Sequence, residues 1–164
     1  MNYIKVPDEI YLSGNENRKK VVELNNEYKS LKNTKEDILK KEEISKKIAE
    51  LKKESTVKIN DKIFINKLLN DIHNSKGIKE NIILKNPNIG LLNDFFNVQF
   101  IYNDVKTSDI NKLKEGYVFE FIIFNNQALI PKYSKNTKNN ISFVRVELSN
   151  NTLKYIENYY NSKK

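Results

Sequence analysis

The first twelve residues carry apolar side chains without the spacing of a helix. Ile4, Ile10 and Leu12 are spaced irregularly, and the Val6-Pro7 dipeptide disfavours helical backbone at the residue before proline. We therefore expect an extended N-terminal arm over residues 1–12, docked on the rest of the chain or on another subunit.

Two stretches with helical periodicity follow. A Ser-Gly-Asn-Glu sequence at 13–16 is typical of a capping box and predicts a helix over about 15–32, and Thr34 with Asp37 predicts a second helix over 35–53. Their apolar positions, which we interpret as a protein interface, are Val21, Leu24, Tyr28, Leu31, Ile44, Ile48 and Leu51. Such thin stripes bury too little surface to hold two helices by themselves. We expect a helical hairpin, coiled-coil-like, that docks on a partner; a single kinked helix and a solvated arm without a partner are the alternatives.

From residue 56 onward, short strand-like segments are interspersed with helical ones. We expect strands near 57–59, 81–84, 98–102, 117–124, 127–133 and 141–148, and helices near 61–74, 90–97 and from about 150 onward. Asn125-Asn126 fits a tight turn between two of the strands. The fold class predicted is α+β: an extended N-terminal arm and long helical hairpin in 1–55, then a small module in 56–164 with an antiparallel β-meander and flanking helices.

Composition changes this picture mainly by what it excludes. The 164 residues include no cysteine and one histidine, His73, so disulfides, Cys-ligated metals and thiol nucleophiles are excluded. His73 is expected on the surface near the end of its helix. The sequence also lacks a Walker A motif and the Gly-x-Gly-x-x-Gly and Gly-x-Ser-x-Gly motifs. We expect no enzyme activity, no metal and no cofactor.

Glu120 is unusual because it interrupts the most apolar strand-like segment of the chain. An acid at this place is expected to point outward or to pair across the sheet with Arg145. A buried functional acid is the alternative.

The charge balance is basic, with a formal net charge of +8. Lysine outnumbers arginine 27 to 2, and Asn, Lys and Ile make up near 45% of the chain, as codons of an A+T-rich genome would produce. The segment 131–145 contains no acid, and its basic and aromatic residues are the nucleic-acid-binding candidates: Lys132, Tyr133, Lys135, Lys138 and Arg145. Lysine contacts with phosphate and stacking by tyrosine suit non-specific binding; a solvated loop shaped by base bias is the alternative.

The sequence thus predicts a non-enzymatic structural or interaction subunit of a larger assembly, with other protein subunits as partners in a homo- or hetero-oligomer. A virion component of a phage or virus with an A+T-rich genome is the preferred form. The alternative is a small basic accessory protein that binds nucleic acid or acts on a host component as an inhibitor. No apolar run reaches the length of about 18–20 residues that a membrane span needs, and the start lacks a signal-peptide core. We expect a soluble protein, cytoplasmic or in a virion, without a membrane partner.

Overall fold

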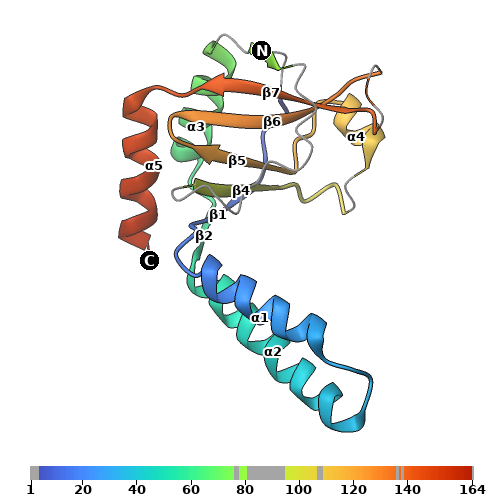
Figure 1. Ribbon diagram of the computed structural model, residues 1–164. Coiled ribbons are helices and arrows are strands. Elements are labelled where there is room, and N and C mark those ends of the chain that lie inside the picture. Colours follow the sequence, from blue (N-terminus) through green and yellow to red (C-terminus); the bar gives the residue numbers. More distant parts are fainter. Residues whose placement is uncertain are drawn as a thin grey trace.

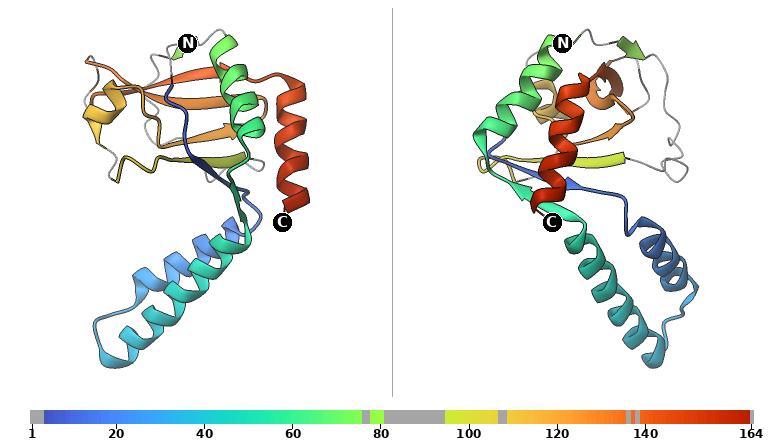
Figure 2. Two further views of the ribbon diagram at one scale, coloured as in Figure 1. Left: turned by 180° about the vertical axis from the view of Figure 1, so that it is seen from behind. Right: turned by 90° about the vertical axis from the view of Figure 1, so that its left-hand side faces the viewer.

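The structure is a computed structural model of the chain, and it describes residues 4–75, 78–80, 95–106, 109–135, 137 and 139–163. A body of sheet and helices carries a two-helix arm that projects from one end (Figure 1). The arm extends away from the body in the two further views as well (Figure 2).

Within the described residues, seven strands form one antiparallel sheet in the order β2-β1-β4-β5-β6-β7-β3. Their bounds are β1 Glu9–Ser13, β2 Thr56–Ile59, β3 Ile78–Glu80, β4 Phe95–Ile101, β5 Glu120–Phe124, β6 Gln127–Tyr133 and β7 Ile141–Glu147. Strands β4 to β7 form a meander because each one pairs with the next in the chain. Asn125, in the turn between β5 and β6, has a φ of 53°, a left-handed conformation that asparagine tolerates.

The helices of the described residues are α1 Arg18–Ser30, α2 Lys35–Glu54, α3 Lys62–Asn74, α4 Ile110–Lys114 and α5 Asn150–Lys163. Helices α1 and α2 lie side by side and leave the body together (Figures 1 and 2). The chain between them is not helical, so this region is two helices and not one rod. Within the described ranges, no helix is both long and apolar enough to cross a membrane.

One face of the sheet forms the core of the body. Ile10 lies opposite both Ile59 and Phe100, and Val98 lies opposite Phe121, and all five side chains are buried. Helices α3 and α5 cover this face (Figure 2). Buried residues alternate with less buried ones along β1, β4 and β5, because one face of these strands lies against the core.

Helix α3 packs firmly because its apolar residues share one side. Its buried side chains are Phe64, Ile65, Leu68, Leu69 and Ile72. The side chain of Asp61 caps the helix by accepting a hydrogen bond from the backbone N–H of Ile63 at 2.9 Å. The ring of Phe64 also lies 4.7 Å from the ring of Tyr159 on α5, centroid to centroid. Burial contributes about 1.5–3 kcal/mol for each large side chain, so α3 is held by the body.

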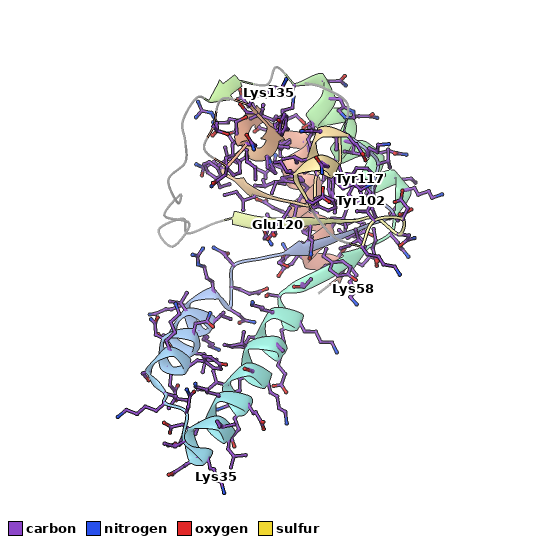
Figure 3. The ribbon with its side chains drawn as sticks, turned by 90° about the vertical axis from the view of Figure 1, so that its right-hand side faces the viewer. Lys35, Lys58, Tyr102, Tyr117, Glu120 and Lys135 are labelled. Atoms are coloured by element: carbon purple, nitrogen blue, oxygen red, sulfur yellow. The ribbon has the colours of Figure 1, made fainter. Side chains whose placement is uncertain are left out.

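The residues before β1 are tied to the body at several points. The Tyr102 hydroxyl donates to the carbonyl oxygen of Lys5 at 2.9 Å, and the ring of Tyr102 packs edge-on against Tyr117 (Figure 3). The backbone N–H of Ile4 donates to Nε2 of His73 at 3.1 Å. This segment is thus packed on the chain's own body.

The predicted α+β class is confirmed, with one sheet and flanking helices. The predicted strand 117–124 is shorter than expected, because β5 begins at Glu120. The helix predicted over 90–97 is wrong for residues 95–97, which belong to β4; pairing with β1 and β5 outweighs local propensity there. The predicted strand 81–84 and residues 90–94 lie outside the described residues.

The predicted extended arm includes an internal strand of the sheet. β1 lies between β2 and β4, with Leu12 opposite both Val57 and Val98. The predicted division after residue 55 separates β1 from β2 and β4, the strands that it pairs with. The sequence does not reveal β1 as a strand, because only two apolar residues, Ile10 and Leu12, alternate there. The arm helices are instead an insertion between β1 and β2.

Candidate functional site: the two-helix arm

The base of the arm is formed where the end of β1 lies beside the start of β2. The hydroxyls of Ser13 and Thr56 lie 2.8 Å apart, and the backbone N–H of Gly14 donates to the carbonyl oxygen of Ser55 at 2.9 Å. The side chain of Asn17 then reaches across from the start of α1 and donates to the carbonyl oxygen of Leu51 on α2 at 3.0 Å. Both helices are therefore anchored to the sheet and to each other.

Tyr160 joins the base of the arm to the C-terminal helix. Its hydroxyl is within hydrogen-bonding distance of two acceptors, the carbonyl oxygen of Ser55 at 2.9 Å and the carboxylate of Glu16. A Cβ atom at Gly14 would lie 2.7 Å from the Tyr160 hydroxyl oxygen, so only glycine fits there without a shift. Burial raises the pKa of Tyr160, which keeps the phenol protonated as a donor. We call Tyr160, Glu16, Gly14 and Ser55 the arm clasp.

The free end of the arm is closed by a capped turn. The Thr34 side chain accepts from the backbone N–H of Asp37 at 3.2 Å, as predicted, and the Asp37 carboxylate accepts from the backbone N–H of Lys32 at 2.9 Å. Lys41 donates to the Asn33 side chain at 3.3 Å. The turn is therefore ordered by its own side chains, far from the body.

The predicted capping box at residues 13–16 is wrong. Helix α1 starts after Asn17, without a side-chain cap. Ser13 is the last residue of β1 and its hydroxyl meets Thr56, while Glu16 faces Tyr160. The two side chains that the predicted cap would need are thus bonded to residues distant in sequence, Thr56 and Tyr160.

The predicted interface residues lie along the seam between α1 and α2. Ile44 is the buried one; Val21, Leu24, Leu31, Ile48 and Leu51 are half-buried, and Tyr28 is 39% exposed. Helix α1 has no buried residue. The seam brings these side chains together but buries only Ile44 among them. Three apolar residues outside the predicted set, Val22, Ile38 and Leu39, are exposed on the arm.

A groove of about 370 Å³ runs along one side of the arm between its helices. Its floor is apolar and its walls carry four glutamates and two lysines; the lining residues are Lys20, Glu23, Leu24, Glu27, Lys47, Glu50, Leu51 and Glu54. We call this feature the acidic groove. It offers two leucine side chains within a ring of charge, which is the composition of a protein-docking surface rather than of a closed small-molecule site.

The predicted nucleic-acid residues do not form one surface. Lys132 and Tyr133 are consecutive in β6 and so point to opposite faces of the sheet. Arg145 shares the face of Tyr133, but it lies four residues along β7 from Ile141, the partner of Tyr133, which is about 13 Å. Lys135 is exposed and lies at the opposite end of the molecule from Lys35 of the arm (Figure 3). Lys138 lies outside the described residues.

Two single residues considered from the sequence also have defined places. Glu120 is exposed and accepts a hydrogen bond from the Asn97 side chain at 2.8 Å, so it is an outward-facing acid whose partner is not Arg145. His73 is half-buried, and burial lowers its pKa. The described residues contain no group of three or more His, Asp or Glu side chains arranged to hold a metal ion.

The arm clasp is the feature that sequence reasoning missed. Tyr160 and Glu16 are 144 residues apart, and no local pattern links them. One signal in the sequence points to it: Gly14 follows the short apolar alternation of Ile10 and Leu12, between a strand and a helix. No protein-family model, curated protein or solved structure matches this chain.

Proposed function

We propose that this protein is a non-enzymatic structural or interaction subunit of a larger assembly, and that the two-helix arm is its docking element. The observation that carries the proposal is the lack of burial in the arm. Helix α1 buries no residue and α2 buries Ile44 alone, although together they contain 33 residues.

A helix in water is stabilised mainly by tertiary burial of its apolar side. The arm instead leaves apolar side chains in solvent, with Val22 44%, Ile38 45% and Leu39 64% exposed. A partner that covers them would supply the missing burial at about 25 cal/mol for each Å² of apolar surface.

The way the arm is mounted supports the same role. The arm clasp and the Ser13–Thr56 contact fix the arm to the sheet at its base, so it presents its surfaces in one direction. A pre-ordered surface loses less entropy on binding than a flexible one. An arm of this kind suits a subunit that connects to neighbours.

A virion component of a phage or virus is the form of assembly that we favour. Its support is the residue usage, in which Asn, Lys and Ile dominate as in an A+T-rich genome. The non-enzymatic part of the proposal rests on the catalytic motifs that the sequence lacks.

Non-specific nucleic-acid binding is the weaker proposal. The ring of Tyr133, which would have to stack on a base, has the ammonium of Lys114 at 4.5 Å from its centroid. The candidate cations are also spread over both faces of the sheet, as described above.

Site-specific photo-cross-linking in the cells that make the protein tests the docking role. A photoreactive phenylalanine replaces Leu24 in the acidic groove or Leu39 near the free end, and in a matched control it replaces Ile63, which is 74% exposed on α3 of the body. We expect cross-linked protein products from the arm positions and few from position 63. Products from position 63 alone, with none from the arm, would overturn the proposal.

A further inference from the structure

The two sides of the arm carry opposite charge. The acidic groove occupies one side, with Glu23 and Glu27 from α1 and Glu50 and Glu54 from α2. Successive residues of a helix are rotated by 100°, so a different set of α1 and α2 residues lies on the side of the arm opposite to the acidic groove. The residues on this reverse side are Arg18, Val22, Asn25 and Lys29 of α1 and Ile38, Lys41, Ser45, Ala49 and Lys52 of α2.

We call this set the basic side. It carries four cations, with Glu42 at its edge, and it includes two of the exposed apolar side chains, Val22 and Ile38. The acidic groove on the opposite side carries two half-buried leucines, Leu24 and Leu51. Each side therefore has a pair of apolar residues among charged ones, with a net negative charge in the acidic groove, which also carries Lys20 and Lys47, and a net positive charge on the basic side.

We infer that a second copy of this chain docks on the arm, with the acidic groove of one copy against the basic side of the next. The inference rests on the proposed docking role of the arm and names its partner. The two surfaces are complementary in net charge and lie along the same two helices, so the chain itself carries a matching surface of the same length. Contact between two acidic grooves would instead bring together eight glutamates and only four lysines, and this net negative charge disfavours it.

Such a contact joins two different surfaces, so it repeats from copy to copy until a ring closes or a filament forms. A 20-residue helix is about 30 Å long, and two helices are about 20 Å wide, which gives each side of the arm roughly 600 Å². Specific interfaces bury about 800 Å² on each partner. A single arm contact is therefore weak, and association depends on protein concentration and on salt.

Charge-reversal variants of the whole chain, followed by sedimentation velocity, test the inference. The first variant reverses the groove with Glu23→Lys, Glu27→Lys and Glu50→Lys. The second reverses the other side with Lys29→Glu, Lys41→Glu and Lys52→Glu. A control matched to the second variant makes the same change of charge on exposed lysines of the body, with Lys62→Glu, Lys135→Glu and Lys154→Glu. Circular dichroism checks that each variant is folded.

The wild-type protein is expected to associate at about 0.02 M salt and to bind about tenfold more weakly at 0.5 M, because salt screens exposed charges. Each reversed variant alone has net charge of the same sign on both sides of its arm. Its copies therefore repel one another, and the variant stays monomeric. An equal mixture of the two associates again, since each groove then meets a side of opposite charge. The control variant associates like the wild type.

Three results would overturn the inference: a wild-type protein that stays monomeric at low salt up to about 1 mM, reversed variants that associate as the wild type does, or a mixture that stays monomeric. The proposed function is judged separately by the cross-linking experiment. Arm cross-links to a different protein, with no self-association, would reject the second copy and keep the docking role. No arm cross-links at all would reject the docking role as well.

Discussion

Helices α1 and α3 have the same length, 13 residues, and opposite surroundings. Helix α3 buries five side chains against the sheet and α5, whereas α1 buries none. The difference lies in the number and spacing of apolar residues, since α3 carries a continuous apolar side and α1 has only Val21, Leu24 and Tyr28 along its seam.

The body and the arm are ordered by different kinds of contact. The body is held by its own core, formed by one apolar face of the sheet and two helices. The arm is held at its base by the arm clasp and at its free end by the Thr34 cap, with a thin seam between. A chain that orders an arm without covering it keeps surface available for binding.

The largest expected effect is in the core of the body. Phe64→Ala removes a fully buried ring from α3, and we expect the free energy of unfolding to fall by about 3–5 kcal/mol. Urea unfolding followed by circular dichroism measures this loss. A loss below about 1 kcal/mol would mean that the body does not depend on the core described here.

A smaller loss is expected at the arm clasp. Tyr160→Phe keeps the ring but removes the hydroxyl that meets Ser55 and Glu16, so we expect a loss of about 1–3 kcal/mol in the same measurement. Tyr159→Phe is the matched control on the same helix, because its hydroxyl makes no hydrogen bond to any of the residues that the structure describes. Equal effects of the two changes would show that the clasp contributes nothing.

Acid is expected to weaken the fold through His73. Burial lowers the pKa of His73 from 6.5, so below pH 6.5 the unfolded chain binds a proton more readily than the folded chain. The contribution of neutral His73 to the free energy of unfolding is fully present above pH 6.5, and it decreases as the pH falls from 6.5 toward the lowered pKa. A protonated ring also stops accepting from the backbone N–H of Ile4.

Unfolding curves across this pH window, for the wild type and for His73→Gln, check the sign. The glutamine oxygen keeps an acceptor near Ile4 and does not titrate. The decrease between pH 6.5 and the lowered pKa should be smaller in the variant. An identical decrease in both proteins would assign the acid sensitivity to other groups.

The smallest effect is expected on the arm itself. Val22 is 44% exposed and lies on the basic side, so Val22→Ala should change the free energy of unfolding of the monomer by no more than about 0.5 kcal/mol. The measurement is made at high salt, where the arm contacts between copies are screened. A loss comparable to that of Phe64→Ala would contradict the contrast between arm and body.

The parts of the fold with strong local patterns were predictable from sequence. The apolar side of α3, the Thr34 cap and the Asn125-Asn126 turn each follow from neighbouring residues. The place of β1 between β2 and β4 was not predictable, because pairing partners up to about 90 residues away decide it. The arm clasp was missed for the same reason, since it joins residues 16 and 160.

The candidate site shows a similar division. The thin seam of the arm predicted too little burial, which agrees with the exposure of Tyr28 and the absence of buried residues in α1. The acidic groove and the basic side were not predictable, because they require the two helices to be placed relative to each other. The nucleic-acid candidates between residues 132 and 145 were grouped because they are near in sequence. Lys132 and Tyr133 are neighbours in β6, however, and therefore point to opposite faces of the sheet.

Hydrogen exchange of the full chain, read peptide by peptide at high and at low salt, tests the central claim most directly. In the dissociated protein at high salt, we expect amides of α1 and α2 to exchange much faster than those of α3 and β5. At low salt the arm amides should become protected while those of the body stay unchanged. Arm amides as protected as the core at high salt, or a salt-dependent change in the body alone, would contradict the claim that the arm is the surface through which this protein assembles.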